Sequence, residues 1–213
     1  MQVTSTRLPY PVSMIVSNVF IESNPDENVV LAISKMLKLD QWYSPVVDNQ
    51  RRYLGVLGLE NVISYILDKD ANALEKSVEQ FMTRDVIVVS YKQSTYSAWQ
   101  LMLSQNIAAL PVVNDKGVLV GVVAEYDLLR YGYSRPKLES DNWLAKSPPI
   151  REVMSTPPVT VAPNDTLRTA AELMITRNIG RVYVVNEYRK LLGVVDREDI
   201  VRAYFSIRGL PLR

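Results

Sequence analysis

The pattern of apolar and polar positions predicts one small unit most clearly between residues 159 and 205. A β-rich run at 159–161 is followed by apolar residues at helical spacing, which predict an amphipathic helix. These residues are Leu167, Ala170, Ala171, Met174 and Ile175. Two apolar runs, 182–185 and 191–195, flank a polar turn and predict a β-hairpin. Helical spacing returns over 196–205, so the predicted order of elements is β-α-β-β-α.

Residue types at the predicted helix ends support this unit. Asn164, Asp165 and Thr166 are N-cap types before the first helix. Gly180 is expected to end that helix, because glycine is favoured just after a helix C-terminus.

The same pattern occurs three times without a gap, which predicts a protein built from repeats. Met36 corresponds to Met102, 66 residues further on, and Met102 corresponds to Met174 after another 72. The same two offsets relate Gly55, Gly121 and Gly193. We expect repeat 1 at 1–67, repeat 2 at 78–131, a linker at 132–149 and repeat 3 at 150–208. The methionines lie on apolar helix faces, so we expect them in the core.

Each repeat is too small to be stable alone, so the repeats are expected to pair. The segment between repeats 1 and 2 is short, which favours pairing of these two. Repeat 3 would then pair with repeat 3 of a second chain in a homodimer, or with a similar unit of another protein.

Composition excludes several classes of function. The chain has 213 residues, 47% of them hydrophobic, with a net charge of +1 and neither cysteine nor histidine. These absences argue against an ordinary zinc site and against Cys or Ser-His-Asp catalysis, so we expect no metal, no cofactor and no enzymatic activity. The near-neutral charge favours neither nucleic acid nor a membrane surface as a partner. With no apolar run long enough to cross a membrane, no secretory signal and no cysteine, the chain is expected to be cytoplasmic.

Two motifs that follow each other in every repeat resemble those of the CBS domain, the repeat named after cystathionine β-synthase. In repeat 2 they are 109–114 (ALPVVN) and 120–127 (VGVVAEYD), and in repeat 3 they are 181–186 (RVYVVN) and 192–199 (LGVVDRED). Repeat 1 has a weaker version, SPVVD and LGVLGLEN. The resemblance implies an α/β fold of the α+β type, in which repeats pair through their sheets into two-fold modules. It also implies clefts that bind adenine nucleotides or S-adenosylmethionine.

The resemblance implies a role for particular residues in repeat 3. Asp199 would hold the ribose hydroxyls and Arg181 the phosphate. The backbone of the first strand would meet the adenine, through Pro158, Val159 and Thr160, with Met154 nearby. Gly180, next to Arg181, completes this predicted site. Asp196 occupies a position where the family has Ser or Thr.

The other two repeats match less well. Repeat 2 keeps the aspartate as Asp127 but has Ala109 at the basic position and Ala124 at the Ser/Thr position. Repeat 1 has Asn61, Gly58 and Tyr43 at the three positions. We therefore rank the sites as repeat 3, then repeat 2, then repeat 1.

Each residue also has a purely structural interpretation. Asp196 and Asp199 resemble a capping arrangement at a helix start, and Arg181 could pair with a surface carboxylate such as Glu187. A second carboxylate in the pocket would repel polyphosphate, which favours AMP over ATP, or a cationic ligand such as S-adenosylmethionine.

Two functions are compatible with this sequence. The favoured one is a non-catalytic regulatory module that senses an adenosine-containing ligand, for example in energy sensing, and acts on an unidentified effector protein. The alternative is a structural dimerisation scaffold whose pockets stay empty.

Overall fold

The structure is a computed structural model that describes residues 11–14, 16, 20–131, 147–210 and 212. The chain divides into two compact units, Met1–Leu59 with Leu212–Arg213, and Glu60–Pro211. Most of the predicted linker at 132–149 lies outside the described residues.

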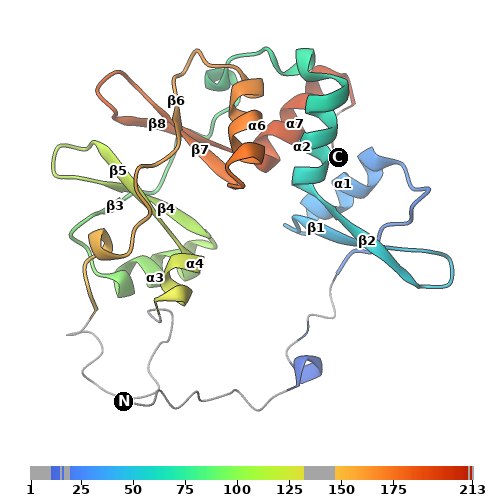
Figure 1. Ribbon diagram of the computed structural model, residues 1–213, viewed down its shortest axis with the longest axis horizontal. Helices are drawn as coiled ribbons and strands as arrows, with labels where there is room; N and C mark the ends of the chain where they lie inside the picture. The colour runs from blue at the N-terminus through green and yellow to red at the C-terminus, as the bar shows by residue number, and fades with distance from the viewer. Residues whose placement is uncertain (1–10, 15, 17–19, 132–146, 211, 213) are drawn as a thin grey trace. The chain divides into compact units, whose positions relative to one another are not determined.

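The first unit contains the beginning of repeat 1 (Figure 1). Its elements are η1 (Val12–Met14), α1 (Val29–Lys38), β1 (Tyr43–Val47) and β2 (Tyr53–Gly58). The helix α2 (Leu59–Lys69), which follows β2, lies in the second unit from Glu60 onward.

The second unit contains two three-stranded sheets, β3-β4-β5 in repeat 2 and β6-β7-β8 in repeat 3 (Figure 1). The elements up to the end of repeat 2 are η2 (Ala71–Leu74), η3 (Val78–Gln80), β3 (Val89–Ser90), α3 (Thr95–Gln105), β4 (Ala109–Val113), β5 (Leu119–Ala124) and α4 (Glu125–Arg130). Repeat 3 contains η4 (Ile150–Glu152), β6 (Thr160–Val161), α6 (Leu167–Thr176), β7 (Arg181–Val185), β8 (Leu191–Asp196) and α7 (Arg197–Ile207). The predicted α/β fold class and the order β-α-β-β-α are therefore confirmed in both repeats.

Strand register reproduces the sequence repeat residue by residue. The parallel pair Val89 with Val112 in repeat 2 corresponds to Val161 with Val184 in repeat 3. In repeat 1 only an isolated bridge occupies this place, between Ser23 and Val46. Each hairpin also has a bulge at the same position, between Val46 and Val47 in repeat 1. Equal spacing in the sequence therefore produces the same hairpin register in all three repeats.

The helix that precedes each hairpin ends at a left-handed residue, and this corrects the role expected for Gly180. The helix α6 ends at Thr176, and Asn178 has φ 50. Asp40 and Asn106 hold the same place in repeats 1 and 2, with φ 51 and φ 52. Asparagine and aspartate tolerate this conformation, so no glycine is required to end these helices.

Repeats 2 and 3 pair through their sheets, whereas the sequence analysis expected repeat 2 to pair with repeat 1. The side chains of Leu119, Tyr183 and Val185 form a buried cluster between the two sheets, with exposed fractions of 1%, 2% and 9%. The segment before the first strand of each of these two repeats crosses to the other repeat. Thr83 pairs with Val194 of β8, and Ser155 pairs with Val122 of β5.

The paired repeats are related by an internal two-fold arrangement. Thr83 and Ser155 are 72 residues apart, and so are their partners Val122 and Val194. The repeat offset therefore relates one bridge to the other. The bridge between Val118 and Lys190 joins two residues that are themselves equivalent. Linker length only limits how far apart two repeats can lie. Each crossing segment forms an isolated bridge with the last strand of the other repeat, and this contact decides the partner.

The crossing segments also explain two of the repeated glycines. A Cβ atom on Gly121 would lie 2.7 Å from Sδ of Met154, and one on Gly193 would lie 2.7 Å from Sδ of Met82. At Gly55, no described heavy atom lies within 4 Å of such a Cβ.

The predicted short linker before repeat 2 is a packed element. Within 71–74 the chain forms the 3₁₀ helix η2, in which Ala73 and Leu74 are buried. The Asp70 carboxylate, just before η2, accepts hydrogen bonds from Tyr204 Oη at 3.0 Å and from Arg208 Nε at 2.7 Å. These contacts join the segment to α7. The equivalent helix methionines, Met36, Met102 and Met174, are fully buried, as predicted.

Candidate functional site

The predicted ribose-binding residue Asp199 lies in the first turn of α7. Its Oδ2 accepts a hydrogen bond from the backbone N–H of Asp196 at 3.0 Å, and Asp196 Oδ1 accepts one from the N–H of Asp199 at 3.0 Å. The two carboxylates therefore cap the helix reciprocally. Each retains a second oxygen for a further partner, so capping and ligand binding are compatible.

The electrostatics around Asp199 are unusual. Burial and the neighbouring Asp196 raise the pKa of the Asp199 carboxyl from its ordinary value of 3.8 to about 7, and Arg181 opposes this rise in pKa. A carboxyl with such a pKa is partly protonated near neutral pH. A hydrogen-bond donor or a cation beside it would stabilise its charged form.

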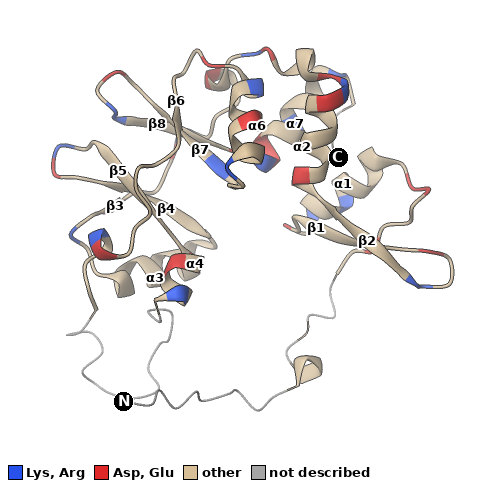
Figure 2. Cartoon of the chain, viewed as in Figure 1, with Lys and Arg blue, Asp and Glu red and all other residues tan. Residues whose placement is uncertain are grey.

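Arg181 lies where the two repeats meet. It is the first residue of β7, and it pairs with Asp196 of β8. Its Nη1 donates to the carbonyl of Ala109 at 3.3 Å, across the repeat boundary. The two strands of the repeat 2 hairpin, β4 and β5, contain no charged residue, whereas β7 begins with this arginine (Figure 2). Arg181 therefore brings a positive charge close to the backbone of repeat 2.

The residue of repeat 2 equivalent to Asp199 is Asp127, in the first turn of α4. Its Oδ2 accepts from the N–H of Ala124 at 2.9 Å, and Ser155 Oγ lies 3.4 Å from its Oδ1. Thr156 Oγ1 donates to the carbonyl of Val120 at 2.9 Å. Two hydroxyl groups from the segment before β6 of repeat 3 thus contact Asp127 and β5 of repeat 2.

The structure divides the predicted residues between the two clefts. Val159 and Thr160 pair with β7 in repeat 3, where the Val159 carbonyl accepts from Tyr183 N at 3.2 Å. Gly180 also lies in repeat 3, and its carbonyl accepts from Arg197 N at 3.1 Å. Pro158 directly precedes this strand.

Met154 is separated from that group. It packs against the core of repeat 2, next to Gly121, and Ala109 lies in the same sheet. Four of the predicted residues therefore lie in the same repeat as Asp199, namely Val159, Thr160, Gly180 and Arg181. Met154 instead packs against repeat 2, the repeat that contains Asp127.

Sequence reasoning missed three hydroxyl residues, Thr83, Ser155 and Thr156. Thr83 and Ser155 are equivalent under the repeat offset, and each pairs with the strand before the other repeat's aspartate helix. Both of these equivalent positions carry a hydroxyl residue, and that recurrence in the sequence could have identified them as candidates. Only the crossing of the segments shows which aspartate each residue faces.

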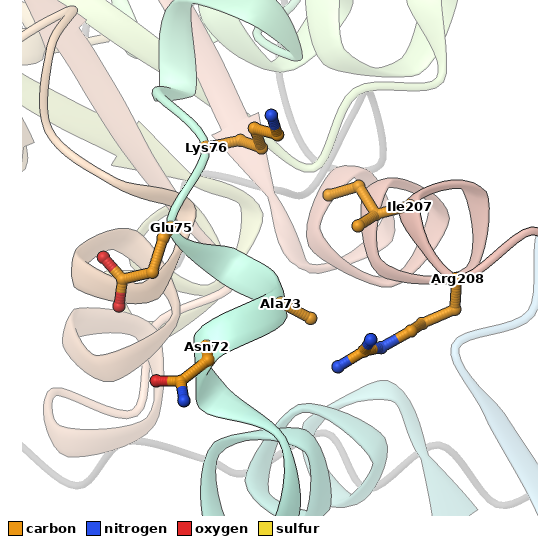
Figure 3. A pocket seen from close by; sticks show the side chains of 6 residues that line it. All are labelled: Asn72, Ala73, Glu75, Lys76, Ile207 and Arg208. Atoms are coloured by element: carbon orange, nitrogen blue, oxygen red, sulfur yellow. The ribbon is translucent and has the colours of Figure 1, made fainter.

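A separate pocket of about 390 Å³ lies between η2 and the end of α7 (Figure 3). It is lined by Asn72, Ala73, Glu75, Lys76, Ile207 and Arg208. Arg208 is bound to Asp70, and Glu75 pairs with Arg168 at 3.4 Å. Two of the charged residues that line this pocket, Arg208 and Glu75, are therefore already paired within the protein.

Two general features of the described residues limit the chemistry. No cluster of three acidic side chains among them could hold a metal ion. None of the helices in the described part of the chain combines the length and apolar character needed to cross a bilayer.

The raised pKa of Asp199 predicts a pH-dependent stability. Between about pH 4 and pH 7 the folded protein holds a proton at Asp199 that the unfolded chain releases. The contribution of Asp199 to folding therefore becomes less favourable as pH rises to about 7, and is constant above it. Relative to wild type, Asp199→Asn should therefore gain about 1–3 kcal/mol of stability between pH 5 and pH 8 in urea denaturation.

Glu198→Gln is the control for this measurement, because Glu198 lies in the same helical turn and carries the same charge. Its difference from wild type should grow less than that of Asp199→Asn between pH 5 and pH 8, because Glu198 accounts for only a smaller part of the rise in the pKa of Asp199. An Asp199→Asn difference that is equal at both pH values would contradict the raised pKa.

A family model described as "CBS domain" matches residues 78–134 and 150–206, just over half of the chain. These ranges contain Asp127 and Asp199. The protein MJ1225 of Methanocaldococcus jannaschii is 27% identical over 202 residues, which is 92% of this chain and 70% of that protein. A second protein of the same organism, MJ1404, is 30% identical over 177 residues, but the chain spans only 42% of its length.

Solved structures show the same fold. The crystal structure of MJ1225 superposes with a TM-score of 0.77 at 24% identity, over 91% of this chain and 70% of that one. CBSX2, a protein from Arabidopsis thaliana, was crystallised in complex with AMP; it gives a TM-score of 0.54 at 31% identity, over 62% of this chain and 98% of that one. The CBS domain pair of protein MJ0100 was crystallised with 5′-methylthioadenosine and S-adenosyl-L-methionine, and gives 0.51 at 26% identity, over 62% and 97%.

Proposed function

Because the chain belongs to the CBS domain family, we propose that it is a non-catalytic regulatory module that binds an adenosine-containing ligand between repeats 2 and 3. The observation that carries the proposal is the position of Asp199 at the start of α7, with Arg181 beside it at the repeat boundary. A helix N-terminus favours an anionic group, and an arginine fork suits phosphate. CBSX2 and MJ0100, which share this fold, were crystallised with adenosine-containing molecules.

The roles of the side chains in this proposal are those that the resemblance to CBS domains implies. In the proposed complex, the second oxygen of the Asp199 carboxylate accepts from the ribose hydroxyls, and Arg181 binds the phosphate. The backbone around Val159 and Thr160 meets the adenine. Asp127 plays the part of Asp199 in the second cleft, where Ser155 supplies a hydroxyl group.

Charge in the Asp199 cleft favours AMP over ATP. Asp196 and Asp199 supply two carboxylates, and Arg181 supplies one cation near them. At an effective dielectric constant of about 20, a further negative charge about 4 Å from a carboxylate costs on the order of 4 kcal/mol before screening. Each additional phosphate is therefore unfavourable, whereas the sulfonium of S-adenosylmethionine is tolerated.

Calorimetry at pH 8 with AMP, ADP, ATP and S-adenosylmethionine tests both the function and the preference. AMP is expected to bind more tightly than ATP, and Asp196→Thr is expected to reduce or reverse the difference. Tighter binding of ATP by wild type would contradict the charge argument. If none of the four ligands binds or raises the melting temperature, the proposed ligand class is wrong.

The second candidate is a structural scaffold with empty pockets. The reciprocal caps between Asp196 and Asp199 favour it, because they give both carboxylates a structural role without a ligand. Under the favoured proposal, ligand binding changes the affinity of the module for an effector protein, as in energy sensing. The ligand screen separates the two candidates.

A further inference from the structure

Tyr183 brings a hydroxyl group into the interior between the sheets of repeats 2 and 3. This residue of β7 is 2% exposed, and it lies with Leu119 and Val185 in the buried cluster between the two sheets. Repeat 2 therefore covers this face of repeat 3 within one chain, whereas the sequence analysis expected a second chain there. The equivalents of Tyr183 in the other repeats are Pro45 and Pro111, so repeat 3 alone carries a hydroxyl at this position.

The buried hydroxyl of Tyr183 has no hydrogen-bond partner in the described part of the chain. By contrast, Tyr204 Oη donates to the Asp70 carboxylate at 3.0 Å. An unpaired buried hydroxyl lowers the stability of a protein, so native structures rarely retain one without a reason. A donor of this kind at the boundary of two repeats is available to a ligand or to a buried water molecule.

Arg181 lies on the same face of β7 as Tyr183, because side chains two residues apart on a strand point to the same side. Its Nη1 reaches the Ala109 carbonyl of repeat 2 at 3.3 Å. Burial raises the pKa of the Tyr183 hydroxyl to about 12, and the positive charge of Arg181 opposes this rise, so the guanidinium acts on the phenol. With this pKa the hydroxyl keeps its proton at neutral pH and remains an uncharged hydrogen-bond donor.

We propose that Tyr183 Oη donates a hydrogen bond to the phosphate that Arg181 binds, and that Tyr183 thereby selects a phosphorylated ligand over a nucleoside. This inference rests on the proposed function, in which Arg181 binds the phosphate of AMP. Phosphate oxygens only accept hydrogen bonds, so they require donors, and the two side chains supply a charged fork and a neutral O–H. Asp199, when charged, can only accept, which suits the ribose hydroxyls and not the phosphate.

The first test compares AMP with adenosine in Tyr183→Phe, which removes the hydroxyl and keeps the ring that packs between the sheets. The variant is expected to bind AMP about tenfold or more weakly than wild type, because a hydrogen bond to a charged group is lost. Adenosine has no phosphate, so its affinity should stay within about twofold of wild type. Calorimetry at pH 8 measures both affinities.

The second test needs no ligand. Because Tyr183 Oη has no described partner in the folded protein, ligand-free Tyr183→Phe is expected to melt at the temperature of wild type or above it. Loss of an internal hydrogen bond or of a buried water would instead lower the melting temperature by about 2–4 °C. Tyr188→Phe is the matched control for both tests, since Tyr188 lies in the turn of the same hairpin and is 68% exposed. It should resemble wild type in affinity and in stability.

Two results would overturn the role of Tyr183. One is a ratio of AMP affinity to adenosine affinity that is the same in Tyr183→Phe and in wild type. The other is a lowered melting temperature of the ligand-free variant, because the hydroxyl would then have a partner inside the folded protein. If wild type binds AMP and either result is found, the role of Tyr183 fails and the proposed function stands. If wild type binds neither AMP nor adenosine, both fail.

Discussion

Asp199→Asn is expected to weaken AMP binding by about 10–100-fold at pH 8. At this pH the wild-type carboxyl, whose pKa is raised to about 7, is mostly charged and accepts strong hydrogen bonds. The asparagine oxygen can still accept the capping hydrogen bond from Asp196, so the helix start is retained. The loss of affinity therefore measures the contribution of the Asp199 charge to ligand binding and not its contribution to the helix cap. Calorimetry with AMP and with adenosine measures this loss of affinity.

Two further variants control this experiment. Glu198→Gln removes a charge from the same turn of α7 and should leave the affinity for AMP within about twofold of wild type. Asp127→Asn makes the same change in the second cleft and should remove only binding that occurs there. If Asp199→Asn binds AMP as tightly as wild type does, Asp199 is only a helix cap.

Gly193→Ala is expected to destabilise the protein by about 1–3 kcal/mol. The added Cβ would lie 2.7 Å from Met82 Sδ and 2.8 Å from the carbonyl oxygen of Thr83. The thioether can rotate away, but the carbonyl belongs to the bridge between Thr83 and Val194. The substitution should therefore push the crossing segment off β8. Urea denaturation monitored by tryptophan fluorescence measures the free energy of unfolding.

Gly55→Ala is the matched control, because it is the same change at the equivalent strand position of repeat 1. No described atom lies within 4 Å of its Cβ, so stability should be unchanged or slightly higher. The comparison is made on dilute protein, so that self-association does not contribute. Equal effects of the two substitutions would show that the crossing segment does not pack on β8 as the structure has it.

Much of the local structure could be predicted from the sequence alone. Apolar spacing predicted the helix faces of Met102 and Met174 and the hairpins that follow them, because a helix or a hairpin depends on residues close together in the chain. The repeat offsets predicted three copies of one unit, and the hairpins of all three have the same strand register. The resemblance to CBS domains also singled out Asp199 and Arg181 before any geometry was known.

Pairing was decided only by the tertiary structure. Linker length in the sequence favoured repeats 1 and 2 as partners, but Thr83 and Ser155 each cross to the other repeat and form a bridge with its last strand. Such contacts join residues far apart in the chain, and their energy depends on the packed sheets and not on local pattern. The same crossing separates Met154 from Asp199 and brings Ser155 to Asp127. The sequence by itself therefore determined what each repeat is, and the tertiary structure decided which repeat completes which cleft.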